Sequence, residues 1–259
     1  MWHRIGSFLL LAHRGQAERY WELDALRGLA ILLMTSYHFV FDLTLFGYSR
    51  ANVFAGVWQY YGRASAVLFL LLAGASLAIS AARGMARSGA APRCAVYLVR
   101  GLTLAGWGLV ISLVSWAYIG QPVIIFGILH LIGVATVLAC PFLRLFPANA
   151  AIGVVLIAAG VFLNALPVAH PWLIWLGLRP PQLRQLDYFP LLPWFGVVLL
   201  GMAAAQTLYP GGVRRFAVPD WGSRPGVGHL VWLGQRSLVI YLLHQPALFG
   251  LLTLLHSLE

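Results

Sequence analysis

Charged residues are scarce in this 259-residue chain, and acidic residues are the scarcest of all. Only 9% of the residues are charged, against about 25% in soluble domains, and 61% are hydrophobic. The chain has no lysine, so all 17 basic residues are arginine, and only seven residues are acidic. This composition excludes an ordinary soluble domain and indicates a polytopic membrane protein. The net charge of +10 does not indicate a nucleic-acid partner, because the arginines lie in short segments between apolar runs.

Cysteine is nearly absent, and the two cysteines do not have the spacing of metal ligands. Cys94 lies at the edge of one apolar segment and Cys140 lies inside another, so both are predicted to be packed thiols. The N-terminus has a short apolar patch but no small-residue cleavage pattern. We therefore expect residues 1–21 to form a cytoplasmic or interfacial segment, and residues 1–259 to form a single membrane-embedded domain.

Apolar runs of the length that a bilayer requires, about 20 residues of helix, recur along the chain. The sequence therefore predicts an all-α, polytopic transmembrane helical bundle of about seven spans. A shorter apolar patch at 172–178 is predicted to be interfacial or re-entrant, between spans five and six. The expected spans are 22–46, 63–82, 94–118, 123–145, 150–166, 188–208 and 230–255.

The arginines are distributed unequally between the two ends of the expected bundle. Cytoplasmic connections carry an excess of arginine, so the distribution places the N-terminus in the cytoplasm and the C-terminus outside. We accordingly expect a multi-pass membrane protein. The N-terminal segment and the second, fourth and sixth connections carry Arg4, Arg14, Arg19, Arg83, Arg87, Arg93, Arg144, Arg214, Arg215 and Arg224. The other connections carry only Arg50, Arg179 and Arg184.

The first span contains ionisable residues that a bilayer-crossing helix rarely has. Such a group in hydrocarbon costs at least about 2.5–3.5 kcal/mol, so it usually faces the bundle interior and marks a functional site. His38 and Asp42 are four residues apart and share a helix face. A histidine held by a carboxylate is a general base, because the carboxylate fixes its tautomer and stabilises the imidazolium. We therefore predict that His38 and Asp42 are catalytic.

Polar residues of other spans are expected at two depths. Near the outer side, a set predicted to bind the substrate comprises His130, Asp187, His244, Gln245 and Arg63. Near the inner face, a set predicted to bind an anionic cofactor comprises Arg27, Arg100 and Arg236. Structural alternatives remain open for each. His130 could bond to a backbone carbonyl in the core, and His244 could cap the cavity or bond to Gln245 without taking part in chemistry. Asp187 could cap the helix that follows it, and the three arginines of the inner set could be anchors at the membrane surface.

The chemistry open to His38 is limited by what surrounds it in the sequence. No Ser-x-x-Lys or Gly-x-Ser-x-Gly nucleophile motif is present. The pair would therefore either deprotonate an acceptor hydroxyl or amine, or accept an acyl group on the imidazole itself. No helix supplies two histidines at metal-ligand spacing, so we predict no metal.

Five stretches of the chain together resemble bacterial relatives of the heparan-alpha-glucosaminide N-acetyltransferase catalytic domain, within the transmembrane acyltransferase superfamily. The first has an Arg-Gly followed by a helix that ends in His, and the five are spread over nearly the whole chain. They are LDALRGLAILLMTSYHF, Arg63 with LFLLLAGASLA, FGILHLIG, DYFPLLPWFGVVLLG and WLGQRSLVIYLLHQP.

This resemblance implies an acyltransferase that moves an acetyl group from cytoplasmic acetyl-CoA to an amino sugar or glycan acceptor on the outer side. By motif, His38 would be the catalytic base or acyl carrier, Asp42 would orient it, and Arg27 would contact a CoA phosphate. The resemblance to bacterial proteins also implies a location in a bacterial inner (plasma) membrane. The expected partners are the lipid bilayer, acyl-CoA and the acceptor, with homo-oligomerisation left open.

Two other functions compete with this interpretation. A proton-coupled transporter would use the same histidines and carboxylates as a relay, but so few acidic residues make a poor continuous path. The odd number of spans also disfavours an inverted-repeat transporter. A noncatalytic membrane partner in an envelope complex would need an exposed face of small residues, which Gly101, Gly106 and Gly108 could supply.

Overall fold

The chain folds into a bundle of helices, as the sequence predicts. A computed structural model describes residues 19–166, 171–180 and 185–258, and within these ranges every regular element is helical. Most of the predicted N-terminal segment, 1–21, lies outside the described residues. The helices are α2 (Trp21–Leu45), α3 (Gly56–Ser88), α4 (Cys94–Ile119), α5 (Ile128–Phe142), α6 (Ala148–Asn164), α7 (Leu191–Leu208), α8 (Pro225–Gln235) and α9 (Ser237–His256), with 3-10 turns η1 (Pro171–Leu173) and η2 (Pro210–Gly212).

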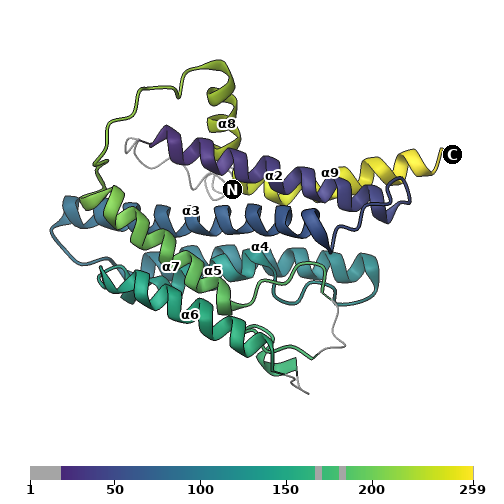
Figure 1. Ribbon diagram of the computed structural model, residues 1–259, viewed down its shortest axis with the longest axis horizontal. Coiled ribbons are helices and arrows are strands. Elements are labelled where there is room, and N and C mark those ends of the chain that lie inside the picture. The colour runs from purple at the N-terminus through teal and green to yellow at the C-terminus, as the bar shows by residue number, and fades with distance from the viewer. Residues whose placement is uncertain (1–18, 167–170, 181–184, 259) are drawn as a thin grey trace, which may run out of the picture.

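Five of the described helices are long and apolar enough to cross a membrane: α2, α3, α4, α7 and α9. Helices α5 and α6 are apolar but shorter, with 15 and 17 residues. Most of the long helices run along the long axis of the molecule, whereas α8 stands across them beside α2 (Figure 1). The all-helical membrane architecture is thus confirmed, while the number of seven spans and their direction stay predictions.

The prediction that residues 230–255 form one helix, the seventh span, is wrong. The chain breaks at Arg236, whose backbone angles (φ −109°, ψ 14°) are not helical, and α8 and α9 lie on either side of the break. The break follows from the packing of α8 on α2. Gly234 lies against the backbone carbonyl of Asp24, and Gly28 lies against the carbonyl of Leu230, so the two helices cross with backbones in contact. A helix held across α2 in this way must bend before it can run along α2 as α9.

Residues 122–126, assigned in part to the fourth span, also differ from the prediction. They are not helical and run beside the segment 185–189, with Leu186 N–H donating to Val123 O at 2.9 Å and Phe189 N–H to Phe126 O at 3.0 Å. These bonds to a distant segment replace the intrahelical bonds of a helix, which therefore begins only at Ile128. The patch 172–178 forms η1 and a turn, and is too short to cross a membrane.

Glycine also allows helices α4 and α5 to pack closely, and this packing buries most of the small-residue face that was predicted to be exposed. Small residues let membrane helices approach with backbones in contact. Gly101 of α4 packs against the Gly133 carbonyl of α5, and Gly108 lies under the ring of His130. Both are buried, and only Gly106 of this series is exposed. The expected exposed face of small residues, on which the noncatalytic-partner hypothesis depends, is therefore not formed.

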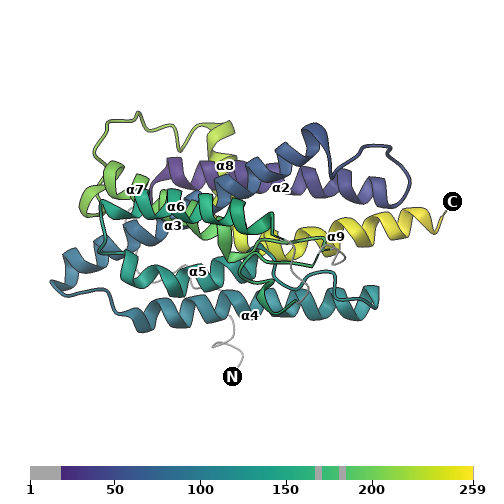
Figure 2. The same ribbon diagram turned by 60° about the horizontal axis from the view of Figure 1, so that its bottom comes forward.

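The two described cysteines are not packed thiols, contrary to the prediction. Cys94 and Cys140 form a disulfide, with their Cα atoms 5.7 Å apart. The cause is the antiparallel pairing of α4 with α5, which the Gly101–Gly133 contact brings together and which places the start of α4 beside the end of α5 (Figure 2). The disulfide lies at the end of the bundle that carries the connections 89–93, 143–147 and 209–224, and thus most of the described loop arginines.

Candidate functional site

Helices α2 and α9 pack against each other, and one histidine from each faces the other. Nδ1 of His38 is 3.0 Å from the carbonyl oxygen of Met34, one turn earlier, and 3.4 Å from Nε2 of His244. The two rings meet edge to face with centroids 4.9 Å apart. Side chains on a helix lean toward its N-terminus, so the ring of His38 folds back over the preceding turn and toward α9.

The hydrogen bonds fix which nitrogen of each ring carries a proton when both rings are neutral. Nδ1 of His244 lies 2.7 Å from the carbonyl oxygen of Tyr241 and 3.2 Å from that of Ile240. A carbonyl only accepts, so Nδ1 of His244 is the protonated nitrogen and its Nε2 has the lone pair. That lone pair accepts the Nδ1 proton of His38. Nε2 of His38 is therefore unprotonated and carries a lone pair, and no described residue donates a hydrogen bond to it.

A second polar contact joins the same two helices one turn further along. Nε2 of Gln245 donates to Oδ1 of Asp42 at 2.7 Å. Asp42 is completely buried, and neither its Oδ2 nor Oε1 of Gln245 has a partner among the described residues. Two buried, unpartnered oxygens on hydrogen-bonded side chains are unusual in a folded protein and mark a place where a donor from a ligand or water is expected. We refer to His38, Asp42, His244 and Gln245 as the polar seam.

The seam brings together four residues that the sequence singles out, but with different partners from those expected. Asp42 was predicted to orient His38. The carboxylate instead accepts from Gln245, and the hydrogen bonds of His38 run to Met34 and His244. The reason is the backward lean of the His38 ring, which carries Nδ1 away from the turn that contains Asp42. Sharing a helix face was not enough to place the two side chains in hydrogen-bond contact.

Two more predicted residues meet at the start of α5. Oδ2 of Asp187 accepts from Ile128 N–H at 3.2 Å, and Nδ1 of His130 accepts from Gly127 N–H at 3.3 Å. Both side chains therefore cap α5. The alternative that Asp187 caps the helix after it is wrong, because α7 begins only at Leu191. Burial raises the pKa of Asp187 from 3.8 to about 6, against the opposing effect of the Ile128 N–H bond.

Tyr241 lies beside the polar seam and near Asp187 of this cap. Its ring centroid is 5.8 Å from that of His244, whose Nδ1 bonds to the Tyr241 carbonyl. Its phenol also lies within electrostatic range of Asp187. Tyr241 is not among the residues predicted from the sequence. The signal that was available is its position three residues before His244, on the same face of the helix.

The four arginines of the predicted sets do not converge on the seam. Nη1 of Arg27 donates to Asp24 at 2.6 Å and Nη2 donates to Ser76 at 2.9 Å, so Arg27 ties α2 to α3. Arg236 stacks over the ring of Trp232, 4.4 Å from its centroid. Arg63 and Arg100 are exposed and make no hydrogen bond or ion pair within the described residues.

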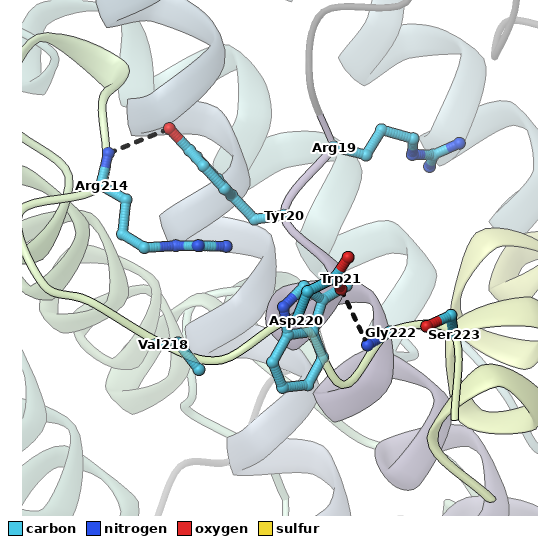
Figure 3. Close-up of a pocket in the computed structure, with 8 residues that line it drawn as sticks. All are labelled: Arg19, Tyr20, Trp21, Arg214, Val218, Asp220, Gly222 and Ser223. Atoms are coloured by element: carbon cyan, nitrogen blue, oxygen red, sulfur yellow. Dashed lines mark hydrogen bonds between the residues drawn. The ribbon is translucent and has the colours of Figure 1, made fainter. Parts of the chain in front are cut away.

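A cavity of about 640 Å³ lies at the opposite end of α2 from the seam, between the start of that helix and the α7–α8 connection (Figure 3). Arg19 and Arg214 approach it from opposite sides of Tyr20 (Figure 3). Arg214 also donates to both carboxylate oxygens of Glu22, at 2.9 and 2.6 Å, and Arg19 pairs with Asp24 at 3.2 Å. The remaining lining residues are Trp21, Val218, Asp220, Gly222 and Ser223.

This cavity was not predicted from the sequence. The signal was present in Arg-Tyr-Trp at 19–21 and in the paired arginines at 214–215, at an end of the bundle rich in basic residues. From Trp21 to His38, α2 runs 17 residues, or about 26 Å at 1.5 Å per residue. The cavity and the polar seam are thus joined by one helix but separated by most of a bilayer thickness.

Within the described part of the chain, no three residues of the types His, Cys, Asp and Glu are grouped so as to hold a metal ion. Neither the curated proteins nor the solved structures contain a match to this chain. One family model does match, described as heparan-alpha-glucosaminide N-acetyltransferase, catalytic, and it covers residues 19–246. That range contains the cavity residues and the whole polar seam. The chain therefore belongs to the heparan-alpha-glucosaminide N-acetyltransferase catalytic family, a family of membrane acetyltransferases.

Proposed function

We propose that the protein transfers an acetyl or other acyl group from acyl-CoA to an amino sugar or glycan acceptor, with His38 as the catalytic residue. The observation that carries the proposal is the lone pair at Nε2 of His38. Nδ1 of the ring is occupied by Met34 and His244, so the ring is held in place and its reactive nitrogen has no partner among the described residues. A membrane helix would not retain such a group without a function.

The donor would enter at the arginine-rich end. CoA carries several phosphates, and a guanidinium binds phosphate through a planar fork of donors. Arg19 and Arg214 flank the cavity with nitrogens beyond those used by their carboxylate partners, and aromatic rings beside them offer surfaces for a base. Excess arginine marks the cytoplasmic side of a membrane protein, so acyl-CoA would bind from the cytoplasm of a bacterial inner membrane.

The chemistry proposed for His38 needs only Nε2. In one route, Nε2 takes the proton of the acceptor as the acceptor attacks the thioester carbonyl, the C–S bond breaks, and the CoA thiolate then receives a proton. In the other, Nε2 itself attacks the carbonyl, the thiolate leaves, and the acceptor takes the acyl group in a second step. The unpartnered oxygens of Asp42 and Gln245 would accept hydrogen bonds from the acceptor's amine or hydroxyl groups.

The test compares purified wild type with His38→Ala in lipid nanodiscs, using labelled acetyl-CoA and a panel of amino sugars. The control is His229→Ala, because His229 is an exposed histidine on α8, outside the seam. We expect His38→Ala to keep acetyl-CoA affinity but to lose transfer by about 10²-fold or more, and His229→Ala to behave like wild type. Wild type without acetyl-CoA affinity, or His38→Ala with normal transfer, would overturn the proposal.

A further inference from the structure

The partner of His38 is a second histidine, and this has a chemical consequence that a carboxylate or a carbonyl would not have. When Nε2 of His38 gains a proton or an acyl group, the ring becomes cationic and its Nδ1 proton becomes acidic. Two atoms contact that proton, the carbonyl oxygen of Met34 and Nε2 of His244. A carbonyl oxygen can orient the ring but cannot take the proton, whereas a neutral imidazole can.

We propose that His244 is a positioning residue that also accepts the Nδ1 proton of His38, so that the two form a two-histidine relay across α2 and α9. This inference rests on the proposed function. The 3.4 Å between the nitrogens is long for a hydrogen bond, as catalytic contacts often are before substrate binds, and it shortens when the ring of His38 becomes cationic. His244 therefore has the place that the sequence assigned to Asp42.

In transfer through an acyl-histidine, every bond that forms or breaks and every proton is accounted for. A bond forms between Nε2 of His38 and the thioester carbonyl carbon, the C–S bond breaks, and CoA leaves as a thiolate. The Nδ1 proton moves to Nε2 of His244, which leaves a neutral acyl-imidazole. The acceptor then attacks the acyl carbon, the C–N bond to His38 breaks, and His244 returns its proton to Nδ1. The proton lost by the acceptor goes to the thiolate, so both histidines end in their starting state.

In direct transfer the same contact is used without a complete proton transfer. Nε2 of His38 takes the acceptor's proton, and the resulting positive charge is shared with His244 through the Nδ1 proton. His244 can bear that charge because its own Nδ1–H is already held by the carbonyls of Tyr241 and Ile240, which favour a cationic ring. Both routes therefore depend on the basicity of Nε2 of His244, and not only on the shape of the side chain.

His244→Gln separates these two roles, with His244→Ala beside it. Glutamine can accept the Nδ1 hydrogen bond through its oxygen but cannot take the proton. A relay predicts that kcat falls by about 10²-fold or more in both variants, with KM for acetyl-CoA little changed. Transfer by His244→Gln within a few-fold of wild type would show that His244 only positions His38, and would overturn the relay.

A second measurement reads the hydrogen bond without any activity. In wild type labelled with ¹⁵N-histidine in lipid bilayers, solid-state NMR should show a nitrogen–nitrogen correlation between Nδ1 of His38 and Nε2 of His244. The correlation should vanish in His244→Gln, and its absence from wild type would overturn the relay. If wild type itself transfers nothing, the proposed function fails and the relay with it. If wild type is active and His244→Gln equally so, the relay alone fails.

Discussion

Replacing Gly234 by alanine should destabilise the protein, because this glycine is where α8 crosses α2. A Cβ at this position would collide with the carbonyl oxygen of Asp24, and would lie 2.7 Å from its carbonyl carbon and 2.9 Å from the Gly28 nitrogen. Ordinary Cβ contacts begin at 3.4 Å. All three atoms belong to the backbone, so neither helix can yield by rotating a side chain, and α8 must move away from α2.

The expected cost is that of overpacking, about 1–3 kcal/mol. For a chain of this size each kcal/mol lowers the melting temperature by about 2–4 °C, so we expect a decrease of about 2–12 °C, measured by thermal unfolding in detergent. Because α8 leads into α9 through Arg236, the displacement should also move His244 away from His38 and reduce acyl transfer.

Gly106→Ala provides the matched control. Gly106 is exposed in the interior of α4, and a Cβ there would meet no atom within 4 Å. The same substitution should therefore leave stability unchanged or raise it by about 0.5–1 kcal/mol through the lower backbone entropy of alanine. A Gly234→Ala protein as stable as Gly106→Ala would refute the packing of α8 on α2 and, with it, the placement of α9 at the seam.

Three further outcomes are expected. The pKa of Asp187 is raised from 3.8 to about 6 in the folded protein, so its contribution to stability is largest below pH 4 and decreases as the pH rises toward 6. Asp187→Asn should therefore abolish the decrease of unfolding free energy between pH 4 and pH 6, measured by denaturation curves. Arg27→Gln should cost about 1–3 kcal/mol by leaving the buried Asp24 with fewer donors, yet leave acetyl-CoA affinity intact in titrations. The Cys94–Cys140 disulfide should be reduced in intact cells, because a cytoplasmic end keeps thiols reduced, so both cysteines should be alkylated after rapid denaturation of the cells and should pair only after purification in oxidising buffer.

Each outcome has a contrary result that is as informative. A pH slope that persists in Asp187→Asn would assign it to another group. Weaker acetyl-CoA binding by a stable Arg27→Gln protein would restore the phosphate contact that the sequence suggested for Arg27. A Cys94–Cys140 disulfide already present in cells would place the arginine-rich end in an oxidising compartment, and the proposed direction of the chain in the membrane would be inverted.

The sequence predicts most of the helices because apolar length is a strong signal. It fails at α8 for a local reason: Gly234 and Arg236 lie within an apolar run, and only the contact of Gly234 with α2 turns that run into two helices. It also misses the disulfide, since spacing along the chain does not show that α4 and α5 pair antiparallel. These features depend on contacts between distant segments, which periodicity does not report.

For the site, the sequence singles out His38, Asp42, His244 and Gln245, which the structure brings together, but it does not show their hydrogen bonds. The partner of His38 depends on which way its ring leans and on how closely α9 approaches α2. Arg27 shows the opposite case: a family motif suggested a ligand contact, whereas the structure gives it Asp24 and Ser76 as partners. Residue type and spacing in the sequence therefore indicate which residues belong to the site, whereas the packing of the helices determines which partners each residue contacts.

The central claim is that an acyl group passes from acyl-CoA through His38 to an acceptor across the membrane. Proteoliposomes test it most directly, with labelled acetyl-CoA supplied on the side of the arginine-rich end and an impermeant amino sugar on the other. The account predicts labelled amino sugar with wild type and with His229→Ala, and none with His38→Ala. Equal labelling by His38→Ala, or no labelling by wild type in either orientation, would contradict it.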